Sequence, residues 1–133
     1  IHERIDALRG LGAGLMYVGE YAEALPHLDA AEQLAEQIQA IDQQANALTI
    51  ASQCLFRLDR WDELFETEKR WRELERNYAR ERIGETCYAV ALCASALALR
   101  GEGELAAHYR AESFDYMVSM SGQPEEWQRN QHY

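Results

Sequence analysis

Histidine side chains are the first candidates for metal or acid–base chemistry in this sequence. Each of the four stands without a second histidine or cysteine three or four residues away, the spacing that would place two ligands on one helix face. They are His2, His27, His108 and His132. HExxH, CxxC and a glycine-rich phosphate loop are also absent. We therefore expect no enzymatic activity, no metal site and no cofactor.

The cysteines are the second group with reactive side chains. Cys54, Cys87 and Cys93 are odd in number and have apolar neighbours, as in CLF and CYAVALC. Such cysteines are typical of reduced thiols that are buried as small hydrophobic residues. Reduced thiols are usual in the cytoplasm, so we expect a cytoplasmic protein.

The overall charge excludes several classes of partner. The 133 residues contain 13 Lys and Arg against 23 Asp and Glu, a formal net charge of -10. This charge repels nucleic acids and anionic lipid. The sequence also contains no run of about 20 apolar residues, the length that a membrane-spanning helix needs. The densest charge run, Glu66 to Arg82, alternates in sign. It indicates a solvated outer helix face with i,i+4 pairs, with an electrostatic docking strip as the alternative.

A short motif must position whatever surface the protein uses, because it recurs at three of the breaks between helical patterns. Gly19 to Leu25, GEYAEAL, separates two stretches with apolar residues at helical spacing. Leu58 to Leu64 and Arg100 to Ala106 are later copies, spaced about 40 and 42 residues apart. A period of this length, with a helical hairpin in each unit, is typical of a helical solenoid.

We therefore expect six helices, with Asp42 and Asp59 as candidate N-caps. The predicted ranges are His2 to Val18, Tyr21 to Gln39, Asp42 to Leu58, Trp61 to Asn77, Arg82 to Leu99 and Glu104 to Met120. Pro124 to Trp127 could begin a short seventh helix that caps the last pair.

The repeated unit resembles the tetratricopeptide repeat family, in a long-repeat variety of about 40 to 42 residues. The first unit fills the family pattern with Leu8, Leu11, Gly12, Leu15, Gly19, Tyr21, Ala24, Leu28 and Ala31. The second offers Leu48, Ala51, Ser52, Leu55, Asp59, Trp61, Leu64 and Trp71, and the third Val90, Cys93, Ala94, Leu97, Gly101 and Ala106. Glu68 and Arg110 depart from the pattern at equivalent places.

The resemblance implies a single domain over residues 1–133, built as a right-handed superhelical solenoid of three antiparallel helix pairs. The repeats are expected at about 2–40, 42–78 and 82–120, with a C-terminal cap at 121–133. The expected fold class is therefore all-α.

The resemblance also implies a function, because the first helices of the pairs would line a concave groove. We expect a non-catalytic module that binds a protein or peptide segment there, within a larger signalling or regulatory protein. The groove residues are expected to be Asp6, Arg9, Met16, Tyr17, Asn46, Thr49, Gln53, Phe56, Arg57, Tyr88 and Ser95. The family's clamp for carboxyl-terminal peptides is not expected, since only Arg9 matches it. Self-association into a homodimer, through the terminal hairpin or the outer helix face, is the alternative.

Overall fold

The expected all-α class is confirmed. The computed structural model describes residues 1–77 and 86–121, without the side chains of 86–88, 116 and 119–121, and these ranges contain six α-helices and no strand. The helices are α1 (His2–Tyr17), α2 (Tyr21–Gln37), α3 (Ile41–Arg57), α4 (Trp61–Asn77), α5 (Thr86–Leu99) and α6 (Gly103–Ser121). The predicted start of the fifth helix at Arg82 and the predicted cap from Pro124 lie outside the described residues.

One turn, used four times, ends α1, α2, α3 and α5. Its central residue has a positive φ in each case: Gly19 at 86°, Gln39 at 56°, Asp59 at 57° and Gly101 at 83°. The next amide bonds back to the helix in each turn, as from Glu20 N to Leu15 O at 2.8 Å. This is the Schellman arrangement, in which a left-handed residue satisfies the last carbonyls of a helix. Four equal turns explain why the helices reverse at regular intervals.

The predicted N-caps are wrong. Asp59 is the left-handed residue that ends α3, and Asp42 lies one residue inside α3. The residue before α3 is Ala40, which makes no side-chain capping bond. Because the Schellman turn already orients the chain for the next helix, each following helix starts from a backbone carbonyl, as in Leu64 N to Arg60 O at 3.1 Å.

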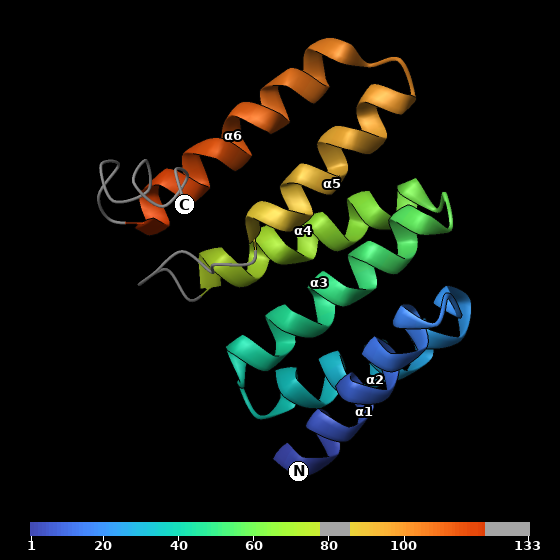
Figure 1. The fold of residues 1–133 in the computed structure, drawn as a ribbon. Helices are drawn as coiled ribbons and strands as arrows, with labels where there is room; N and C mark the ends of the chain where they lie inside the picture. The colour runs from blue at the N-terminus through green and yellow to red at the C-terminus, as the bar shows by residue number, and fades with distance from the viewer. Residues whose placement is uncertain (78–85, 122–133) are drawn as a thin grey trace, which may run out of the picture.

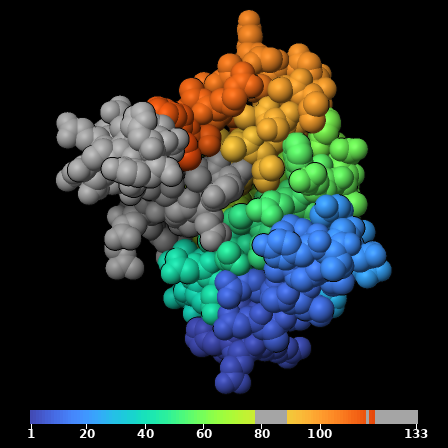
Figure 2. All heavy atoms as spheres, viewed as in Figure 1, coloured from blue at the N-terminus to red at the C-terminus, as the bar shows by residue number. Residues whose placement is uncertain are grey.

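Consecutive helices pack against one another along the whole described chain. In addition α3 contacts both α1 and α5, whereas α2 and α4, and α4 and α6, make no close backbone approach. Figure 1 follows the pairs from the blue N-terminal end to the orange C-terminal end. In the space-filling view these two ends lie apart, with the green residues between them (Figure 2). The α1, α3 and α5 helices therefore form one continuous row.

A small buried residue recurs at the same place in the first helix of each pair. Gly12, Ser52 and Ala94 are all buried and occupy equivalent positions relative to the turns at 19, 59 and 101. A Cβ on Gly12 would lie 2.6 Å from the Leu28 side chain, so α1 and α2 approach closely there. Close packing of this kind leaves no room for a larger residue.

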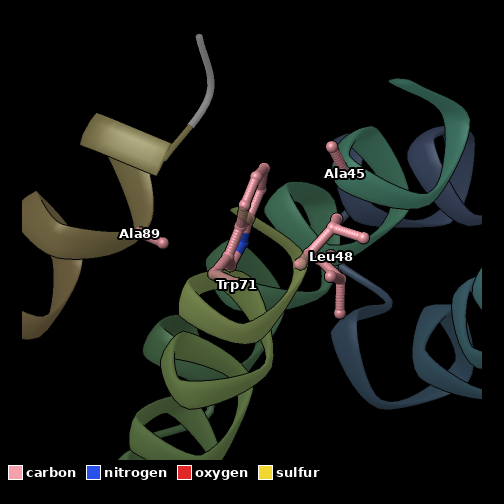
Figure 3. Packing of buried hydrophobic residues seen from close by; sticks show 5 residues of the cluster. Ala45, Leu48, Trp71 and Ala89 are labelled. Atoms are coloured by element: carbon pink, nitrogen blue, oxygen red, sulfur yellow. The ribbon is translucent and has the colours of Figure 1, made fainter. Parts of the chain in front are cut away.

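Trp71 joins the second helix pair to the third. Its ring is fully buried and packs between Leu48 of α3 and Ala89 of α5 (Figure 3). The indole N–H has no hydrogen-bond partner in the described part of the chain, so apolar contact holds the ring. Burial of an aromatic side chain of this size is among the largest single contributions to a core.

Candidate functional site

Five of the predicted groove residues meet at one pocket of about 430 Å³. It lies where the C-terminal ends of α1 and α3 come together beside the middle of α5. The lining residues are Met16, Tyr17, Tyr21, Gln53, Phe56, Arg57 and Leu92, and we call this the terminal pocket. Tyr21 and Leu92 are not among the groove residues expected from the sequence. Tyr21 follows the turn of the first pair and begins α2.

The repeat explains why these side chains converge. Met16 and Phe56 hold the same position in successive pairs, as do Tyr17 and Arg57, because the turn residues Gly19 and Asp59 set the register. Since α1 and α3 lie side by side, equivalent positions on them become neighbours in space. A signal for the site was therefore present in the 40-residue spacing of large side chains.

The walls of the terminal pocket are mostly apolar and partly fixed. The ring of Phe56 stacks on Trp61 with centroids 6.5 Å apart, and the Trp61 indole N–H donates to the Phe56 carbonyl at 3.4 Å. Tyr17, in contrast, is 84% exposed. The pocket thus combines one aromatic ring that is fixed by packing, Phe56, with one that is largely exposed to solvent, Tyr17.

Arg57 supplies the charge of the terminal pocket. It is exposed and makes no ion pair with any residue that the structure describes. The two arginines of the larger cavity described below, Arg60 and Arg70, are bound to Glu63 and to Glu32. An unpaired guanidinium beside an apolar hollow can bind a carboxylate through two parallel hydrogen bonds.

A polar network joins α1 to α3 near their N-terminal ends, at the other end of these helices from the terminal pocket. Arg9 donates to Asp6 at 3.0 Å and to Asn46 at 3.1 Å, and Gln43 donates to Asp6 at 3.2 Å. His2 lies 3.3 Å from the Gln43 side-chain oxygen. These groups satisfy one another, so this end offers adaptable hydrogen bonds rather than a free charge.

The remaining predicted residues are placed differently. Thr49 is buried and its hydroxyl donates to the Ala45 carbonyl at 3.1 Å, whereas Ser95 is exposed and bonds to the Ala91 carbonyl at 3.2 Å. Tyr88 belongs to α5, and its side chain lies outside the described atoms. Thr49 therefore presents no polar group to the surface.

A larger cavity of about 630 Å³ lies on the other side of α3, between α2 and α4. Its floor includes Leu28 and Leu55, and Arg70 spans it to reach Glu32. The Glu32 side chain is only 3% exposed, and burial raises the pKa of its carboxyl in spite of Arg70. An ion pair between a half-exposed arginine and a buried carboxylate therefore crosses this cavity.

A second charged bridge lies between α4 and α6. Arg72 donates to both Glu112 oxygens, at 2.7 and 2.6 Å, and also to the buried Glu68. The guanidinium lies 5.8 Å from the centre of the Tyr109 ring. The hydrogen bonds to Glu112, and to a lesser degree the bond to Glu68, raise the pKa of Arg72 above its usual high value. The polar residue Glu68, at a slot where the repeat pattern favours an apolar one, is buried with a partner.

Two of the three cysteines lie among the described side chains. Cys54 and Cys93 are buried free thiols, and burial raises the pKa of Cys93 to about 12. No cluster of three potential metal ligands occurs in the part of the chain that the structure describes. None of the described helices has the length and apolar character that a membrane crossing requires.

Comparison with protein-family models, with curated proteins and with solved structures finds no match to this chain.

Proposed function

We propose that the chain is a tetratricopeptide-like interaction module that holds a peptide or protein segment against the row formed by α1, α3 and α5. The three antiparallel pairs would form a right-handed solenoid whose concave side is this row. The module would be non-catalytic and cytoplasmic, and would act as a scaffold within a larger signalling or regulatory protein. A protein ligand also agrees with the net charge of -10, which disfavours nucleic acid.

The observation that carries this proposal is the convergence of side chains from all three helix pairs at the terminal pocket. Met16 comes from the first pair, Phe56 from the second and Leu92 from the third. Aromatic residues, Met and Arg are the side chains most enriched at the centre of protein interfaces. The polar network near the N-terminal ends of α1 and α3 could form hydrogen bonds with the rest of an extended ligand.

Selection of short peptides from a random display library tests the proposal. The immobilised wild-type protein is used for selection, and the affinity of the selected peptides is then measured for the wild type and for two variants, Phe56→Ala and Tyr17→Ala. Tyr17 is largely exposed, so its replacement should leave the fold intact, and circular dichroism checks this for both variants. We expect enriched peptides that bind the wild type and lose at least about tenfold in affinity for each variant. Peptides that bind all three proteins equally would contradict the proposal.

Self-association is a second candidate, and the exposed apolar residues of the last pair favour it. Leu99 is 66% exposed and Leu105 is 45% exposed, on either side of the turn that joins α5 to α6. Two copies could bury these leucines against each other. Light scattering over a concentration series tests this: a dimer that is lost in Leu99→Ser/Leu105→Ser would support it, and a monomer at every concentration would exclude it.

A further inference from the structure

We propose that the terminal pocket recognises an acidic hydrophobic segment, in which a large apolar or aromatic side chain stands next to Asp or Glu. This inference rests on the proposed function, because it assumes that a polypeptide binds along α1, α3 and α5. It adds the chemistry of the residues that the pocket selects.

The apolar part of the ligand follows from the walls of the pocket. Met16, Phe56 and Leu92 are partly buried, so each still presents apolar surface to the hollow. Tyr17 at the end of α1 and Tyr21 at the start of α2 also line the pocket. Methionine and aromatic walls adapt to large side chains such as Leu, Met, Phe or Trp. A volume of about 430 Å³ admits one such side chain with part of its backbone, and does not admit a folded domain.

The acidic part follows from Arg57. Arg57 lines the pocket, is exposed, and makes no ion pair with any described carboxylate. By contrast, the cations at the α2–α4 cavity and at the α4–α6 bridge are neutralised by Glu32, Glu63 and Glu112. A ligand carboxylate at Arg57 would restore the pairing that the other arginines at these sites already have.

The net charge makes this contact selective rather than merely attractive. A chain of charge -10 repels acidic segments over most of its surface. Only a segment whose carboxylate reaches Arg57 while its apolar neighbour enters the pocket gains both contacts. Charged groups at an interface contribute to specificity in this way more than to affinity.

Matched synthetic peptides test the inference. Each carries one Leu, Met, Phe or Trp, flanked by Glu in one series, by Gln in the second and by Lys in the third. Isothermal titration measures their Kd for the wild type and for Arg57→Gln. Tyr17→Ala reports whether binding occurs at the pocket. Arg110→Gln is the matched control, because Arg110 is an exposed arginine on α6 and lines none of the sites described here.

We expect the Glu series to bind about tenfold more tightly than the Gln series, and Arg57→Gln to remove this difference. Arg110→Gln should change neither Kd. In Arg57→Glu the order should invert, with the Lys series preferred. The charge reversal makes the test independent of small changes in folding.

The other outcomes separate the two levels of the proposal. Peptides that lose affinity in Tyr17→Ala but bind equally well with Glu or Gln would overturn the acidic preference and leave the proposed function standing. Binding that is unaffected by Tyr17→Ala would place the ligand elsewhere and overturn both. A Glu preference that persists in Arg57→Gln would overturn the role of Arg57.

Discussion

Arg72 of α4 binds Glu112 of α6 with two nitrogens, at 2.7 and 2.6 Å, across a gap that the two helix backbones do not close. The same relationship occurs one helix pair earlier with the charges reversed. There Glu32 of α2 pairs with Arg70 of α4. Glu32 and Arg72 hold equivalent positions relative to the turns at Gly19 and Asp59.

The partners Arg70 and Glu112 are equivalent in the same way, relative to Asp59 and Gly101. Each bridge therefore links the second helices of neighbouring pairs at the same height. Because the backbones of α2, α4 and α6 do not approach one another closely, long side chains such as these connect the three helices. We infer that the two bridges help to set the angle between successive pairs.

Removal of Arg72 should destabilise the protein more than removal of its partner. Arg72→Met leaves the buried carboxylate of Glu68 without its cation, and we expect a loss of about 3 kcal/mol in the free energy of unfolding. Glu112→Gln keeps a hydrogen-bonding partner and should cost about 1 kcal/mol or less. Urea denaturation measures both, with Lys69→Met, at an exposed pair on the same helix, as a control near zero. Equal losses for Arg72→Met and Glu112→Gln would contradict this account.

Three glycines of α1 should respond differently to alanine. Gly12→Ala places a Cβ within 2.6 Å of the buried Leu28, so we expect a loss of about 1 to 3 kcal/mol from overpacking. Gly10→Ala and Gly14→Ala meet no atom within 4 Å and should gain about 0.5 to 1 kcal/mol from helix propensity. Thermal unfolding followed by circular dichroism compares the three. A stabilising Gly12→Ala would show that α1 and α2 cross less closely.

The turn after α2 can be improved by glycine. Gln39 has a φ of 56°, a conformation that costs a residue with a Cβ about 1 kcal/mol. Gln39→Gly should therefore raise the free energy of unfolding by up to about 1 kcal/mol, whereas Gly19→Ala should lower it by a similar amount. Chemical denaturation of both variants checks the opposite signs. A loss of stability in Gln39→Gly would mean that this turn does not have the left-handed form.

Glu32 should make the stability of the protein depend on pH. Burial, together with the nearby carboxylates of Glu36 and Asp29, raises the pKa of Glu32 in the folded state, and Arg70 offsets this only in part. Between the unfolded value and the raised folded value, the folded state binds more protons. The contribution of Glu32 is therefore fully present below the unfolded pKa and is lost as the pH rises through the folded pKa.

The measurement for this prediction is urea denaturation of the wild type and Glu32→Gln at several values between about pH 4 and pH 7. The wild type should gain stability relative to Glu32→Gln as the pH falls. A difference that stays constant, or that moves in favour of Glu32→Gln at low pH, would contradict the assigned direction of the pKa.

The helices and their order could be predicted because local signals specify them. The turn motif contains Gly19 and Gly101, and the described boundaries of α1 to α4 and α6 lie within two residues of the predicted ones. The N-caps at Asp42 and Asp59 were predicted wrongly. An Asp before a helix favours both a cap and the left-handed conformation, and only the backbone bonds between the helices decide which occurs.

The charged bridges could not be predicted from local patterns. The run from Glu66 to Arg82 indicated pairs within one helix, and Lys69 with Glu66 is such a pair. Arg72 also pairs with Glu68 at i,i+4, as the pattern predicts. In addition Arg70 and Arg72 reach other helices, which depends on the distance between pairs and not on spacing along one helix. Leu92 was missed at the terminal pocket for the same reason, since it joins the pocket from the third helix pair. Tyr21 was missed because it begins α2, a second helix, and only the first helices were expected to line the groove.

The central claim is that a polypeptide binds along the row of α1, α3 and α5. Backbone amide chemical-shift mapping of the ¹⁵N-labelled protein, titrated with a peptide from the display selection, tests it most directly. We expect the largest shifts at Met16, Gln53, Arg57 and Leu92, with small shifts along the outer faces of α2 and α4. Largest shifts at Asp29, Glu66 and Arg70, around the cavity between α2 and α4, would contradict the account.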